Sequence, residues 1–234
     1  MSNVRRQGRL MRGPKQVAKR ALVATCLSFR ASLEATEHPC STSLSASILP
    51  WLTTHGLADE LDPIEREILQ TPYGQLRDDQ IADANWSGEA AWVFAWAIGV
   101  VEQPPEIELV DYRILTQRLE LLRTDPTRLI GGAVLRAESQ LVEFCTNTVA
   151  IRTELQRQRV SDTPHQVFDQ VLQARLERIG LSASDIAISS ARDFVNNLTD
   201  EQRRAVAGLY FIRDFAATWL FDDRPTFFAS ASVS

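Results

Sequence analysis

Apolar and polar residues recur along this chain at helical spacing, and the clearest pattern is a stretch that has no polar face. From Trp86 to Val101 the sequence reads WSGEAAWVFAWAIGVV. Wound at 3.6 residues per turn, its apolar side chains cover every side of a helix. A helix that is apolar all round is a buried helix. The pattern therefore predicts a tryptophan-rich central helix that begins at Asp78 or Asp79 and stops before Gln103-Pro104-Pro105.

Amphipathic stretches on both sides of this segment predict further helices. Helix starts are indicated by a capping side chain followed by proline or by an acid or amide three residues later, as at Asp62, Asp125 and Thr199. Gly131-Gly132 is expected to kink the helix that starts after Asp125 and not to end it. The expected helices are residues 15–33, 44–54, 62–70, 78–101, 111–123, 125–159, 163–179, 182 or 184–197, and 199–221.

No alternating strand pattern and no internal repeat is present in the sequence. The fold class is therefore all-α: a single globular bundle of about eight or nine helices around the buried tryptophan-rich helix. We expect a basic disordered arm over residues 1–14, one domain over residues 15–223 and a flexible tail over residues 224–234. The longest apolar run, Ala90 to Val101, is shorter than the ~20 residues that span a bilayer, so no membrane span is expected.

Charge is distributed unevenly along the chain. The first 33 residues carry eight Lys or Arg and no acid, which leaves 17 basic residues against 30 acidic ones in the remainder. This basic start has three interpretations: an ordinary first helix, which we favour, a secretory signal, and an organelle transit peptide. A short apolar run and Arg30, at the place of a cleavage site, count against secretion.

The cysteines give a weak indication of the compartment. Cys26, Cys40 and Cys145 are odd in number, widely spaced and outside any paired-cysteine motif. This usage favours a reducing environment, so we expect a cytoplasmic protein.

Glu89 is the strongest single candidate for a functional residue. It is the only charged residue between Asp83 and Glu102, and helical geometry directs it among the tryptophans. Burial raises the pKa of a carboxylate unless a cation or hydrogen-bond donors offset the loss of water, and such groups gather at functional sites. The structural alternative, which we favour, is a buried ion pair with an arginine of another helix. The candidate partners are Arg20, Arg203 and Arg204.

Other polar clusters indicate weaker possibilities. Asp78, Asp79 and Asp83 supply oxygen ligands for magnesium, but they also suit a solvated helix start. Three possible zinc ligands lie near one another in sequence: His38, Cys40 and His55. Zinc needs a fourth ligand and usually more closely spaced pairs, and the sequence has neither here. We expect no metal and no cofactor. The basic arm offers phosphate contacts, yet nucleic acid is an unlikely partner because the arm lacks aromatic residues and the remainder is acidic.

The central segment resembles a known bacterial family. Trp86-x-x-Glu89-Ala90 followed by Trp92-x-x-x-Trp96-Ala97-Ile98-Gly99 is similar to the signature of the domain-of-unknown-function family forty-two seventy-two, over roughly residues 15–223. Lys19-Arg20-Ala21-Leu22 and Arg203-Arg204-Ala205 occupy places comparable to the family's basic early helix and late arginine helix. The chain departs from the family pattern at residues 141–159, which contain no tryptophan. The resemblance implies a helical fold and supplies no activity.

Three functions follow as hypotheses. The first is a non-enzymatic interaction or adaptor protein that binds a protein partner or itself. The second is a small hydrolase that uses Glu89 or the aspartate group with a metal, and the third is nucleic-acid contact through the arm. The candidate binding residues are Trp86, Glu89, Trp92, Trp96, Arg203 and Arg204.

Overall fold

The computed structural model of the chain describes residues 11–36, 39–159, 165–182 and 184–222. Within these residues it contains ten α-helices, one short 3-10 helix (Ala58–Glu60) and no strand, which confirms the predicted all-α class. The helices are α1 (Pro14–Glu34), α2 (Ser41–Thr54), α3 (Pro63–Gln70), α4 (Asp78–Ala97), α5 (Tyr112–Arg118), α6 (Thr127–Gly132), α7 (Glu138–Arg159), α8 (His165–Arg178), α9 (Asp185–Asn197) and α10 (Asp200–Trp219).

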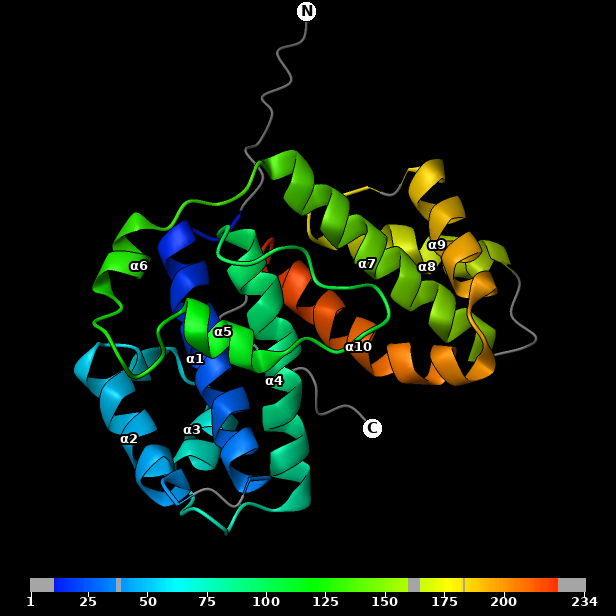
Figure 1. Cartoon of the computed structure of the whole chain (residues 1–234). Coiled ribbons are helices and arrows are strands. Elements are labelled where there is room, and N and C mark those ends of the chain that lie inside the picture. The colour runs from blue at the N-terminus through cyan, green and yellow to red at the C-terminus, as the bar shows by residue number, and fades with distance from the viewer. Residues whose placement is uncertain (1–10, 37–38, 160–164, 183, 223–234) are drawn as a thin grey trace, which may run out of the picture.

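The central helix α4 lies between α1 and α10 (Figure 1). On one side, α2 and α3 pack against α1, and on the other, α7 packs against α10 and also contacts α8 and α9. The segment that joins α4 to α5, here called the α4–α5 loop (residues 98–111), crosses in front of α10 in this view. The molecule is thus a row of helices in which α4 joins two halves.

The apolar segment of α4 is buried as its sequence predicts. Every residue from Ser87 to Ile98 is buried, including Trp92 and Trp96. Backbones approach closely on both sides of the helix: a Cβ atom at Gly88 would lie 2.7 Å from Ser28 Oγ of α1, and one at Gly208 of α10 would lie 2.8 Å from the Trp86 ring. Glycine at these two positions allows α1 and α10 to pack directly on α4.

α4 is shorter than predicted. It ends at Ala97 because Gly99 adopts a left-handed conformation with φ of 75°, which glycine reaches without strain. The sequence placed the end at Val101, before the Gln103-Pro104-Pro105 segment. The two prolines therefore lie within the loop, several residues after the helix has already stopped.

The expectation of one kinked helix over residues 125–159 was wrong. α6 ends at Gly132, residues 133–137 are not helical, and α7 begins at Glu138. In this break the backbone N–H of Arg136 donates to the Ala97 carbonyl (2.8 Å), and its side chain donates to the carbonyls of Trp96 (2.7 Å) and Val101 (3.1 Å). The break therefore supplies hydrogen-bond donors for the Trp96 and Ala97 carbonyls in the last turn of α4 and for the Val101 carbonyl that follows it.

Other boundaries agree with the capping signals. Asp62 and Thr199 form capping boxes with Glu65 and Gln202, and Ser184 accepts a hydrogen bond from the Ala187 N–H. α5 stops at Arg118, five residues earlier than expected, just before positions of positive φ at Glu120 and Leu122. No helix among the described residues is both long and apolar enough to cross a membrane.

Candidate functional site

Glu89 forms a buried ion pair with Arg213 of α10. Both side chains are almost completely buried, with 3% and 2% of their surface exposed. Arg213 Nε and Nη2 lie 2.8 Å and 2.7 Å from the same carboxylate oxygen, Glu89 Oε2. The carboxylate is thus paired with a cation inside the protein, which offsets the free-energy cost of burying it.

The same pair holds the α4–α5 loop. The second carboxylate oxygen, Glu89 Oε1, accepts a hydrogen bond from the Val110 N–H at 2.8 Å. Arg213 also donates to the backbone carbonyls of Pro105 and, at 2.9 Å, Glu108. Near the beginning of the loop, Trp92 Nε1 donates to the Glu102 carbonyl at 2.8 Å. Glu89, Trp92 and Arg213 therefore fix the course of the loop over α10.

The arginine partner differs from those considered in the sequence. Arg20 instead forms a buried two-oxygen ion pair with Glu65 of α3. Arg203 and Arg204 lie in the first turns of α10, where Arg203 donates to the Leu198 carbonyl and Arg204 donates to that of Asp200. They are ten and nine residues before Arg213, or about 14–15 Å along the helix axis, and therefore too far from Glu89.

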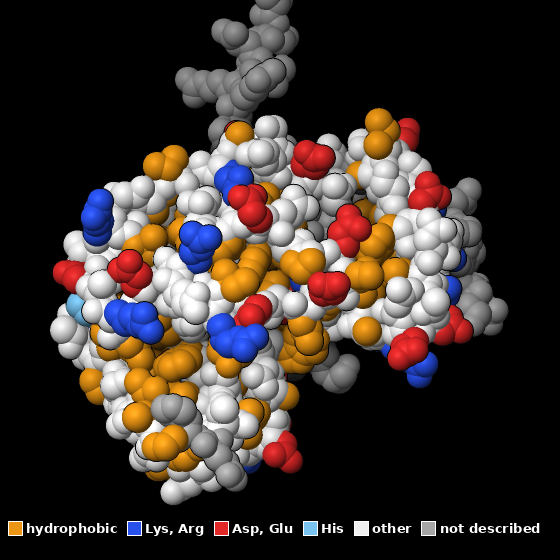
Figure 2. Space-filling view, viewed as in Figure 1, with side chains coloured by type: hydrophobic (Ala, Val, Ile, Leu, Met, Phe, Trp, Pro, Cys, Tyr) orange, Lys and Arg blue, Asp and Glu red, His pale blue; other side chains and the backbone are white. Residues whose placement is uncertain are grey.

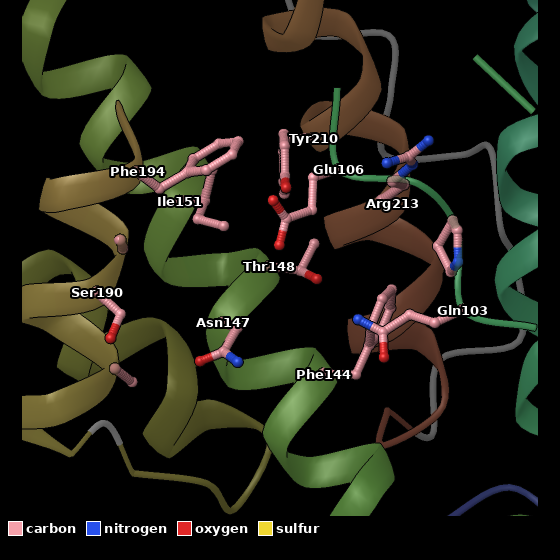
Figure 3. Close-up of a pocket in the computed structure, with 13 residues that line it drawn as sticks. Gln103, Glu106, Phe144, Asn147, Thr148, Ile151, Ser190, Phe194, Tyr210 and Arg213 are labelled. Atoms are coloured by element: carbon pink, nitrogen blue, oxygen red, sulfur yellow. The ribbon is translucent and has the colours of Figure 1, made fainter. Parts of the chain in front are cut away.

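A groove borders the α4–α5 loop. It lies between that loop, α7, α9 and α10, and has a volume of about 170 Å³ (Figure 3). One part of its lining is apolar, from Phe144, Ile151, Ala187, Ala191 and Phe194. The other part is polar, from Gln103, Glu106, Asn147, Thr148, Ser190, Tyr210 and Arg213, and Pro104 also lines the groove. The lining therefore combines apolar side chains, which can bury part of a ligand, with polar groups that can fix its orientation.

Glu106 and Tyr210 define the polar end of this groove. Figure 3 shows the Glu106 carboxylate pointing into the groove, between Tyr210 and Thr148. Burial raises the pKa of Tyr210 to about 12, with a contribution from the negative charge of Glu106 and an opposing one from Arg213. Its hydroxyl therefore stays protonated at neutral pH and is available as a hydrogen-bond donor.

A second buried charge cluster lies next to the groove. Asp214, with 1% of its side chain exposed, accepts hydrogen bonds from Arg152 of α7 and Arg175 of α8. The Arg152 guanidinium lies over the Phe211 ring, 4.4 Å from its centroid. The adjacent residues Arg213 and Asp214 thus join α10 to opposite sides: to α4 through Arg213, and to α7 and α8 through Asp214.

The structure separates the other candidate clusters or leaves them at the surface. Asp78, Asp79 and Asp83 are exposed in the first turns of α4, and Asp79 pairs with Arg77. Cys40 and His55 lie at opposite ends of α2, whereas His38 is outside the described residues. Among the described residues, no group of three or more His, Cys, Asp or Glu is arranged to hold a metal ion.

The basic N-terminal region is partly engaged within the fold. Residues 1–10 of the predicted arm are outside the described residues. Arg12 stacks on Trp219 at 4.2 Å, Lys19 pairs with Glu60 at 2.9 Å, and Arg30 is fully buried and pairs with Glu34. These side chains stabilise the contacts of α1 and are not a free surface for phosphates.

The sequence also contains a signal that Arg213 and Asp214 are buried and paired. They interrupt an otherwise apolar run from Val206 to Phe221, as Glu89 interrupts the apolar part of α4. A charged residue in an apolar helix predicts a buried partner, and the same reasoning applied to both helices would have paired them. The groove had no such signal, because it depends on how α7, α9 and α10 are placed.

Comparison with protein families supports the resemblance noted in the sequence. The family model described as "Domain of unknown function (DUF4272)" matches residues 4–178. The match contains α1 to α8 and ends before α9 and α10, which form one wall of the groove and supply Arg213. Comparisons with curated proteins and with solved structures found no significant match. Because the match covers most of the chain, this protein belongs to the DUF4272 family.

Proposed function

We propose that this protein is a non-enzymatic interaction protein whose groove, between the α4–α5 loop, α7, α9 and α10, receives a short segment of a protein partner. The observation that carries this proposal is the groove itself, which combines apolar side chains with hydrogen-bonding groups from four separate segments. Such a lining buries one apolar side chain of a ligand while polar groups fix the ligand's orientation.

The position of Glu89 supports binding over hydrolysis. A catalytic carboxylate has to reach the substrate, whereas Glu89 is buried and both of its oxygens are occupied by Arg213 and Val110. The role that its contacts support is positioning of the α4–α5 loop, which forms a wall of the groove.

A cytoplasmic location forms part of the proposal. The three cysteines are odd in number and widely spaced in the sequence, which favours a reducing compartment: Cys26, Cys40 and Cys145. Contact with nucleic acid is not part of it, because Arg12, Lys19 and Arg30 of the basic region are engaged within the fold.

Two neighbouring serines of α9 provide the test. Ser190 lines the groove and is exposed, so Ser190→Trp is expected to fill the groove without disturbing the core. Ser189 is equally exposed but does not line it, which makes Ser189→Trp the matched control. Labelled protein is applied to an array of random hexapeptides, and bound peptides are then titrated into ¹⁵N-labelled protein.

We expect the wild-type chain and Ser189→Trp to bind a common set of peptides, with shift changes at amides of Asn147 and Thr148. Ser190→Trp should bind these peptides at least about tenfold more weakly, a loss of about 1.4 kcal/mol. Binding that survives Ser190→Trp, or an absence of any bound peptide, would overturn the proposal.

A further inference from the structure

The groove continues beyond the part shown in Figure 3. A second hollow, with a volume of about 270 Å³, adjoins it and shares Gln103, Phe144 and Asn147 as lining residues. The second hollow extends along α7 towards Gln140 and is closed on the other side by Trp96 and the beginning of the α4–α5 loop. The two hollows together are here called the long groove.

One face of α7 forms the floor of the long groove. The residues of α7 that line it recur at the i, i+3, i+4, i+7 spacing of one helical face: Gln140, Glu143, Phe144, Asn147, Thr148 and Ile151. From Gln140 to Ile151 the helix advances by eleven steps, or about 17 Å at 1.5 Å per residue. An extended peptide advances ~3.3 Å per residue, so about five residues fit along this floor.

The charge of the lining is negative. Glu102 and Glu143 line the second hollow, and Glu106 points into the first. All three glutamates belong to exposed positions. In Figure 2, acidic side chains gather over the region in which Figure 1 shows the α4–α5 loop and α7.

The two cations of the lining are already engaged. Arg136 donates to the carbonyls of Trp96 and Val101, and its guanidinium lies 5.5 Å from the centre of the Trp96 ring. Arg213 is neutralised by Glu89. Arg136 keeps its positive charge, so the three glutamates of the lining face one positive charge that no acid among the described residues pairs with, and the excess of negative charge complements a cationic ligand.

We propose that the long groove binds an extended basic peptide segment, with an apolar side chain at Phe144, Ile151 and Phe194 and flanking Arg or Lys side chains at Glu102, Glu106 and Glu143. This inference rests on the proposed function and specifies its ligand. The apolar contact supplies burial, and the glutamates select the charge and direct the approach of the peptide.

The test uses three fluorescein-labelled hexapeptides that share a central leucine. Their flanking residues are arginine in the first, glutamine in the second and glutamate in the third. Fluorescence anisotropy with the full chain at ~50 mM and ~200 mM salt measures the affinities, since screening weakens pairs of exposed charges. We expect the arginine peptide to bind about tenfold more tightly than the glutamine peptide, the glutamate peptide to bind most weakly, and the preference for arginine to shrink at the higher salt.

Variants of the protein test which glutamates cause the preference for the arginine peptide. Glu106→Gln/Glu143→Gln should weaken binding of the arginine peptide about tenfold while changing that of the glutamine peptide less than about twofold. Glu120→Gln/Glu201→Gln removes the same charge at exposed positions outside the groove and should change neither. Ser190→Trp should weaken the binding of both peptides, because the tryptophan blocks the groove without changing its charge.

Each alternative result has a distinct meaning. Equal binding of the arginine and glutamine peptides, still blocked by Ser190→Trp, retains the proposed function and overturns the charge preference. Arginine-peptide binding that resists both Ser190→Trp and the double glutamine variant places the site elsewhere and overturns this inference. Displacement by equimolar spermidine as effective as by unlabelled peptide would show a site for free polycations and overturn the peptide assignment. No binding of any peptide overturns both proposals.

Discussion

In the half of the molecule built from α1 to α5, two buried arginines of α1 connect that helix to the two ends of α3, whereas in the half built from α7 to α10 one buried carboxylate connects three helices. Arg20 joins α1 to Glu65 at the beginning of α3, and Arg30 donates to the carbonyls of Thr71 and Pro72 after α3. In the other half, Asp214 of α10 binds arginines of both α7 and α8. Polar contacts are thus added to the apolar contacts between α10 and α7, whereas α1 packs on α4 through apolar side chains and at Gly88.

The difference explains why the groove lies in the second half. Close packing of α1 on α4 at Gly88 leaves no space between these helices. Between α7, α9 and α10, long side chains bridge the helices and an open space remains beside them. The Glu89–Arg213 pair connects the two halves, and it also fixes the loop that closes the groove on one side.

Removing Arg213 is expected to have the largest effect. Arg213→Met leaves Glu89 buried without its counter-ion, which should lower the free energy of unfolding by about 3–5 kcal/mol. The comparison is Arg20→Met, which isolates Glu65 in the first half and should lower stability by a similar amount. Urea unfolding measures both.

Hydrogen exchange separates these two variants. Only Arg213→Met should accelerate exchange at the Val110 amide, because Arg213 orients the carboxylate that this amide binds and holds the loop through the Pro105 and Glu108 carbonyls. Equal acceleration in both variants would mean that the pair does not hold the loop specifically. A stability loss below about 1 kcal/mol in Arg213→Met would contradict the role of the Glu89–Arg213 pair in connecting the two halves of the molecule.

The two close-packed glycines provide the next comparison. An added Cβ at Gly208 would lie 2.8 Å and 3.0 Å from atoms of the rigid Trp86 ring, so Gly208→Ala should lower the free energy of unfolding by about 1–2 kcal/mol. At Gly88 the nearest atom is the Ser28 hydroxyl, which can rotate away, and alanine gains about 0.5–1 kcal/mol of helix propensity. Gly88→Ala should thus lie within ~0.5 kcal/mol of the wild type by thermal unfolding. A larger loss of stability in Gly88→Ala than in Gly208→Ala would show that α1 packs more tightly on α4 than α10 does.

Substitution of the aspartates at the beginning of α4 should have the smallest effect on the free energy of unfolding. Partial burial, with a contribution from Asp79, raises the pKa of Asp83, so ionised Asp83 opposes folding. Asp83→Asn should therefore stabilise the protein at pH 7 by less than about 0.5 kcal/mol, given solvent screening. The gain should vanish as the pH falls below the carboxyl's unfolded pKa, because both states are then protonated.

Asp79 is the matched position, at which the substitution is expected to change stability in the opposite direction. Its hydrogen bond with Arg77 lowers the pKa of Asp79, so ionised Asp79 favours folding. Asp79→Asn should lower the melting temperature at pH 7, and this difference should also vanish as the pH falls through the lowered pKa. Shifts of the same sign in both variants would contradict the ion-pair contribution.

The local features of this fold could be predicted because their causes are local. The capping boxes at Asp62 and Thr199 contain both partners within four residues, and the apolar run in α4 requires burial whatever surrounds it. The errors occurred where a distant contact decided the outcome. Gly131-Gly132 ended a helix instead of kinking it, and the break places Arg136 on the carbonyls at the end of α4.

The sequence by itself determined that α4 is buried and that its one carboxylate needs a partner, because apolar surface and charge have a fixed preference for their surroundings. Only the tertiary structure decided that this partner is Arg213, 124 residues further along the chain, and that a groove lies beside the pair. Those features depend on how α10 crosses α4 and how α9 packs on α7. Such placement results from the sum of many weak contacts across the whole chain and is not encoded in any one segment.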